Sequence, residues 1–92
     1  MGTVESKEET GQAELETLKM MVSNWRRRYE TWLTPGDNEY VFEEFMEDIQ
    51  IHLAPYVERL LQTEYWADKE GTELSLYILS QLEELKGKAN EL

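Results

Sequence analysis

The sequence contains no cysteine, a single histidine and only two prolines among its 92 residues. Without cysteine, disulfide bonds and thiolate zinc sites are excluded. No apolar run approaches the roughly 20 residues that a helix needs to span a bilayer. Residues 1–10 are polar and acidic, unlike a signal peptide. We therefore expect a cytoplasmic protein that does not bind membranes.

Basic residues are also scarce. Nine lysines and arginines face 20 acidic residues, which gives a formal net charge of −11. This balance disfavours direct binding to nucleic-acid phosphates or anionic lipid. The charge is uneven, since residues 1–36 carry a net of −1 and residues 37–92 a net of −10. The stretch from Asp37 to Ala54 holds six acids and no base.

The length allows one domain, and a domain this small gains stability readily from a partner. Aromatic residues make up 11% of the chain, which argues against a wholly disordered protein. Residues 1–11 have almost no apolar side chains after Met1. We interpret them as a flexible leader and residues 12–92 as a single helical domain.

The first predicted helix runs from about residue 12 to 33. Its apolar residues recur at alternating spacings of three and four, which is typical of a helix with one buried face. They are Leu15, Leu18, Val22, Trp25, Tyr29 and Trp32. Thr34 to Asn38 then form a short loop containing Pro35 and Gly36, which favours antiparallel neighbours.

The second predicted helix covers residues 39–64. Its apolar phase continues unchanged across Pro55, so we favour one helix kinked at this proline. The alternative is a break, with Pro55 opening a new helix. The third helix is predicted over residues 72–89, with Thr72 as its N-cap. No segment alternates with the period of a strand, and we predict an all-α, antiparallel three-helix bundle.

No catalytic constellation is evident. Ser23, Ser75 and Ser80 fall inside predicted helices rather than on an exposed turn, and no glycine-rich phosphate loop exists. His52 follows Glu44 and Asp48 at helical spacing, so a metal-dependent helical enzyme is an alternative. Further ligands are missing, and we interpret His52 as a partly buried residue at the edge of the apolar stripe, paired with Asp48. We predict a non-enzyme without cofactor, metal or small-molecule substrate.

Arg26, Arg27 and Arg28 form the one basic run. A functional interpretation makes them a clamp for a partner's acids. Consecutive helical residues diverge by about 100°, so the three side chains fan apart. We favour the simpler interpretation, in which they lie along the core edge and pair with acids of the second helix.

The surface most suited to a partner is predicted on the second helix. Its outer face is acidic and is interrupted by Ile51, while Leu76 and Trp66 also depart from the apolar stripes. The candidate partner surface comprises Glu43, Glu44, Glu47, Asp48, Ile51, Trp66 and Leu76.

These features predict a small acidic protein–protein interaction module, such as a regulatory, adaptor or assembly subunit. It would bind a protein partner or form a homodimer. The alternative is an acidic inhibitor that mimics DNA and occupies a nucleic-acid-binding protein.

Overall fold

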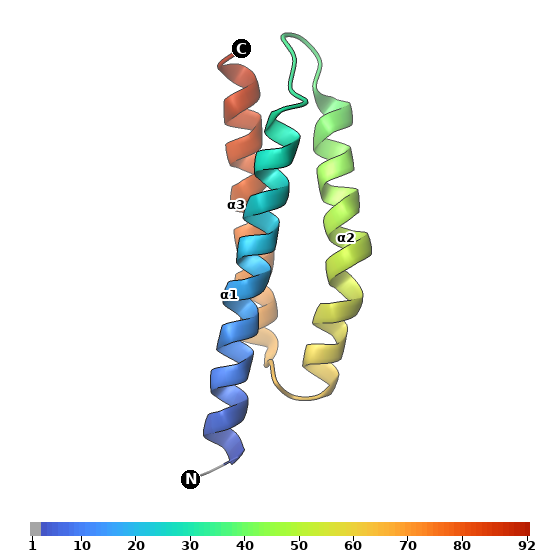
Figure 1. Cartoon of the computed structure of the whole chain (residues 1–92). Helices are drawn as coiled ribbons and strands as arrows, with labels where there is room; N and C mark the ends of the chain where they lie inside the picture. Colours follow the sequence, from blue (N-terminus) through green and yellow to red (C-terminus); the bar gives the residue numbers. More distant parts are fainter. Residues whose placement is uncertain (1–2) are drawn as a thin grey trace.

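The computed structural model describes the backbone of residues 3–92 and the side chains from Glu9 onward. Three helices form the fold: α1 (Thr3–Glu30), α2 (Glu39–Gln62) and α3 (Asp68–Asn90). The described chain contains no strand. α1 and α3 run in one direction and α2 in the other, side by side along a narrow rod (Figure 1). The predicted all-α three-helix bundle is confirmed.

The core lies along the axis of the rod. Its completely or almost completely buried side chains come from all three helices and include those that the spacing of apolar residues predicts for α1. They are Leu15, Leu18, Val22, Phe45 and Leu85. Trp32, which the same spacing also assigns to the buried face, is 48% exposed at the turn that follows α1.

α1 begins at Thr3, so the predicted start near residue 12 is wrong. Gly11 does not interrupt the helix, because its backbone is held against the connection between α2 and α3. The indole nitrogen of Trp66 donates a hydrogen bond to the carbonyl oxygen of Gly11 at 2.8 Å. The flexibility proposed for residues 1–11 stays a prediction, and Met1 and Gly2 lie outside the described residues.

α2 continues through Pro55 as one helix, which confirms the predicted continuity, whereas the kink stays a prediction. The helix ends at Gln62 rather than residue 64. Glu64 terminates it with a φ of 64°, in the left-handed region that usually favours glycine. In this conformation the amide of Glu64 donates to the carbonyl of Leu61, and the amide of Trp66 donates to that of Leu60. The chain thereby turns sharply and directs Trp66 back toward the core.

α3 begins at Asp68, one turn earlier than predicted, and its N-cap is Ala67 rather than Thr72. An alanine side chain cannot cap the amides of the first turn, and the polar side-chain contact at this N-cap comes from the carboxylate of Glu70. It accepts a hydrogen bond from the amide of Ala67 at 2.7 Å. Acidic residues in this first turn also suit the positive end of the helix.

Candidate functional site

A groove lies between α2 and α3 on the described surface. Its first part is a hollow of about 570 Å³, whose described lining residues belong to α2 and α3 alone. Most of them are apolar: Met46, Ile49, Gln50, Leu53, Ala54, Val57, Glu58, Leu61, Gly71, Leu74, Ser75, Ile78 and Leu79. Leu79 is 50% exposed and Leu61 37% exposed, so apolar side chains reach the solvent here.

Small residues keep this hollow open. Ala54 lies on the α2 side, and Gly71 and Ser75 lie one turn apart on the α3 side. A Cβ atom built on Gly71 would meet no atom within 4 Å, so this position borders unfilled space. Larger residues here would close the gap between the helices.

A second hollow, of about 580 Å³, lies between the same two helices, nearer the loop between α1 and α2. The two hollows share Met46. The second is lined by Gly36, Asp37, Asn38, Glu39, Phe42, Glu43, Met46, Leu82, Lys86, Ala89 and Asn90. We call the two hollows together the α2–α3 groove; it follows most of the length of both helices.

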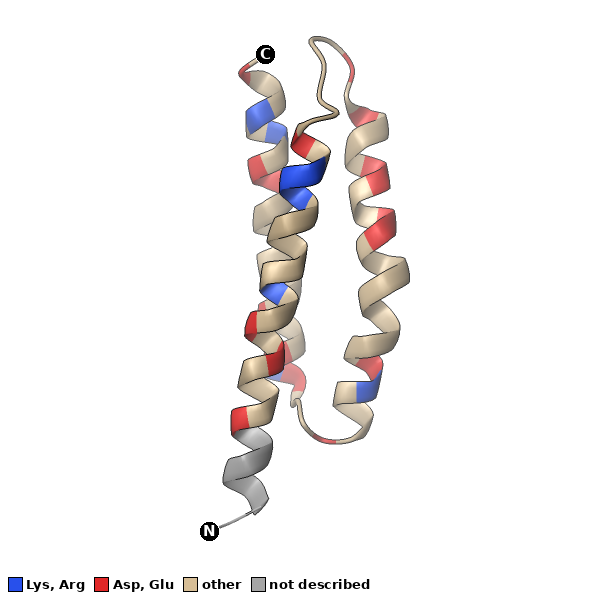
Figure 2. Cartoon of the chain, in the orientation of Figure 1, with Lys and Arg blue, Asp and Glu red and all other residues tan. Residues whose placement is uncertain are grey.

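The charge along the groove is mainly negative. Its acidic lining residues are Asp37, Glu39, Glu43 and Glu58, and Lys86 is the basic one among the residues described. Figure 2 shows acidic positions on α2 near the end that follows the α1–α2 loop and no basic position there. The groove therefore combines an apolar floor with an acidic border along α2.

The residues of the predicted partner surface do not form one patch. Glu43 borders the groove, and Glu47 is exposed nearby on α2. Ile51 and Leu76 are 58% and 62% exposed, but neither lines the groove. Their role in binding stays a prediction.

Glu44 and Asp48 are half-buried. The hydroxyl of Tyr29 donates a hydrogen bond to the carboxylate of Asp48. This contact ties α2 to α1 and removes Asp48 from the outer acidic face. The outer face of α2 therefore exposes fewer carboxylates than the sequence suggests.

Trp66 does not lie on the surface. It is 3% exposed and packs in the core, with its indole bonded to Gly11. A Cβ atom at Gly11 would come within 2.3 Å of the carbonyl oxygen of Tyr65. Sequence periodicity cannot detect this pair, because the two residues meet only through the tertiary fold.

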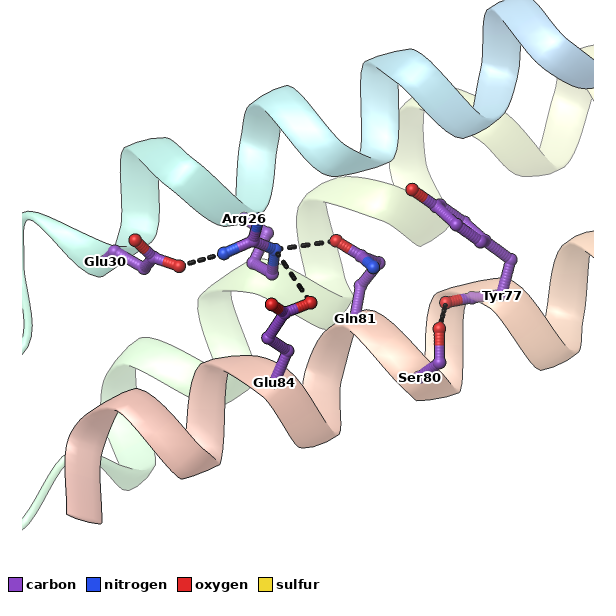
Figure 3. A network of polar contacts seen from close by, with 6 residues as sticks. All are labelled: Arg26, Glu30, Tyr77, Ser80, Gln81 and Glu84. Carbon is purple, nitrogen blue, oxygen red and sulfur yellow. Dashed lines mark hydrogen bonds and ion pairs between the residues drawn. The ribbon is translucent and has the colours of Figure 1, made fainter. Parts of the chain in front are cut away.

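The arginine run separates as the helical geometry predicts, but its pairing differs. Arg26 is buried and faces α3 rather than the acids of α2 (Figure 3). Its Nε atom donates to Gln81 at 2.6 Å and lies 3.8 Å from a carboxylate oxygen of Glu84. It also pairs with Glu30 one turn along α1. Arg26 therefore stabilises the α1–α3 contact, while Arg27 and Arg28 are exposed.

His52 is exposed and stacks on Trp25, with ring centroids 5.7 Å apart. The expected burial and the pairing with Asp48 are wrong, because Asp48 bonds to Tyr29 instead. Among the described residues, no group of three or more His, Cys, Asp and Glu side chains is placed to hold a metal ion. No helix within the described part is long and apolar enough to cross a membrane.

The Tyr29–Asp48 contact predicts a loss of stability at alkaline pH. Burial raises the pKa of Tyr29 above 10.0, and the hydrogen bond to Asp48 and the negative charges of Asp48 and Glu44 raise it further. The contribution to stability is complete below the unfolded pKa of about 10 and falls as the pH rises toward the higher folded pKa. Urea denaturation between neutral pH and about pH 12 should show this decline.

In Tyr29→Phe the decline should be smaller, because no phenol has to ionise at this buried position. Tyr40→Phe is the matched control, since Tyr40 is 65% exposed. A decline of the same size in Tyr29→Phe and the unchanged protein would contradict this assignment.

Comparisons with known proteins give no relative from which a function could be transferred: no protein-family model, curated protein or solved structure matches the chain.

Proposed function

We propose that this chain is a non-enzymatic protein-interaction module whose binding surface is the α2–α3 groove. The observation that supports the proposal is the apolar floor of the groove, which includes the half-exposed Leu79. Exposed apolar surface of this kind commonly marks sites of protein contact. A groove between two helices accepts the apolar face of another helix, as four-helix arrangements and helix-in-groove complexes do.

Leu79→Glu is expected to weaken partner binding at least about tenfold, because complex formation would bury a carboxylate against apolar side chains. Leu76→Glu is the matched control on the same helix, since Leu76 is 62% exposed and lies outside the groove. Both changes affect exposed positions, so circular dichroism should show unchanged helicity. The measurement is quantitative affinity purification with each variant as bait.

These purifications distinguish binding at the α2–α3 groove from binding at the outer surface around Ile51 and Leu76. Proteins recovered by the unchanged chain and by Leu76→Glu, but lost with Leu79→Glu, would support the groove. If Ile51→Glu and Leu76→Glu abolish recovery while Leu79→Glu does not, the partner binds the outer surface predicted from the sequence. Retention of every partner by Leu79→Glu would refute the proposal.

Mimicry of DNA by the acidic face receives less support. Asp48 is used internally by Tyr29 and Glu44 is half-buried, which leaves Glu43 and Glu47 as the exposed members of this acidic cluster. A mimic would also bind chiefly through charge, so its complex would dissociate steeply as salt is added. Binding through an apolar groove would retain affinity at high salt.

A further inference from the structure

The acids along the α2–α3 groove have no basic partner within the described chain. Glu39, Glu43 and Glu58 are exposed, and none of them forms an ion pair with a described residue. Glu30 and Glu84, in contrast, are both within ion-pair distance of Arg26. The negative charge that borders the groove is therefore available to an external group.

The spacing of these acids fits a ligand that is extended along the groove. Glu39 and Glu58 are 19 residues apart on α2, which corresponds to about 28 Å at the helical rise. Glu43 lies one turn after Glu39. A helix of about five turns lying in the groove would pass all three carboxylates. Long lysine or arginine side chains at its edge could reach them while its apolar face occupied the floor.

A second copy of the chain would be a poor partner for the acidic border of the groove. Each copy carries a formal charge of −11 and the same acidic border. The exposed basic pair Arg27 and Arg28 lies on α1, whose apolar stripe is already buried in its own core through Leu15, Leu18 and Val22. Outside this stripe the large exposed apolar side chains described on α1 are Met20 and Met21, so α1 would offer the groove of another copy much less apolar surface than an amphipathic helix.

We propose that the α2–α3 groove binds a basic amphipathic helix of another protein. Its apolar side chains occupy the floor beside Leu79, and its lysines or arginines pair with Glu39, Glu43 and Glu58. Such pairing sets the orientation of the bound helix and speeds its encounter with the groove. This inference rests on the proposed function, and it adds the chemical class of the partner.

Three synthetic peptides of about 18 residues, or roughly five turns, provide the test. The first has leucines at helical spacings of three and four, flanked by lysines, with alanine and glutamine elsewhere. The second replaces every lysine by glutamate. The third has the composition of the first in an order that removes the apolar face. Each carries a fluorescent label, and binding to the full chain is measured by anisotropy.

The basic amphipathic peptide should bind at least about tenfold more tightly than the acidic one. The scrambled peptide should not saturate. Glu43→Lys/Glu58→Lys should weaken binding of the basic peptide about tenfold and strengthen binding of the acidic peptide. Glu9→Lys/Glu16→Lys makes the same change in net charge on α1 and should alter affinity less than about threefold.

Several results would overturn the inference, and they are distinct. Equal binding of the basic and acidic peptides, with both lost in Leu79→Glu, would retain the groove but refute its preference for bases. Equal weakening by the two double variants would show general attraction to an acidic protein. A sedimenting dimer that Leu79→Glu converts to a monomer would assign the groove to a second copy. If Leu79→Glu affects no peptide, the proposed function itself fails.

Discussion

Trp66→Ala is expected to lower the free energy of unfolding by about 3–5 kcal/mol, the range for removal of a large buried aromatic side chain. Trp66 is 3% exposed, and its loss would leave a cavity between the helix connection and α1. The hydrogen bond to the carbonyl of Gly11 would disappear as well. A domain of this size has a total stability of only about 5–15 kcal/mol, so much of it depends on this residue.

Urea denaturation of Trp66→Ala, Trp66→Phe and Trp32→Ala would measure the effect. Trp66→Phe keeps an aromatic ring but loses the hydrogen bond, and should fall between the alanine variant and the unchanged protein. Trp32 is 48% exposed, so Trp32→Ala should cost less than about 1 kcal/mol. Equal losses for Trp66→Ala and Trp32→Ala would mean that Trp66 is not buried.

Gly11→Ala is expected to destabilise the protein by about 2 kcal/mol, although alanine is the better helix former. The new Cβ atom would lie 2.3 Å from the carbonyl oxygen of Tyr65 and 3.3 Å from Cδ1 of Trp66. Backbone must move to relieve such a contact, and overpacking of this kind costs about 1–3 kcal/mol. The contact would also disturb the hydrogen bond between Gly11 and Trp66.

Gly87→Ala is the matched control, because the same substitution is made inside a helix where a Cβ atom meets nothing within 4 Å. Alanine should stabilise α3 by about 0.5–1 kcal/mol here. The two variants should therefore shift the urea midpoint in opposite directions. A shift of the same sign would contradict the close approach at Gly11.

The helices could be predicted because each one buries a single face. In α1 the spacing of Leu15, Leu18 and Val22 indicates the buried stripe directly, and all three are fully or almost fully buried. The unbroken phase of apolar residues across Pro55 likewise predicts one continuous α2. Local periodicity carries this information, because residues three and four apart share a helix face.

The errors concern contacts between distant segments. Trp66 lies outside every apolar stripe, so the sequence suggests an exposed residue, yet the turn at Glu64 directs it into the core. The sequence predicts that Arg26 pairs with acids of α2, whereas the packing of the helices places it against Gln81 and Glu84 of α3. The spacing of residues along one helix does not determine which neighbouring helix is contacted by the residues beside its apolar stripe.

The groove cannot be predicted from the sequence for the same reason. Glu43 could be selected because acidity is visible in the sequence, but the apolar floor requires knowledge of how α2 and α3 lie together. A sequence signal did exist, since Ala54, Gly71 and Ser75 place small side chains beside the apolar stripes of both helices. Small residues at such positions leave space only if no third element covers them, which the spacing alone cannot establish.

Mapping the bound basic amphipathic peptide by NMR tests the central claim, that the α2–α3 groove is the binding surface. Addition of the peptide to the ¹⁵N-labelled chain should shift the amide signals of Ala54, Gly71, Ser75 and Leu79 most strongly. Signals from the outer face of α1, such as Asn24, should stay in place. The largest shifts around Ile51 and Leu76, or along α1, would contradict the account.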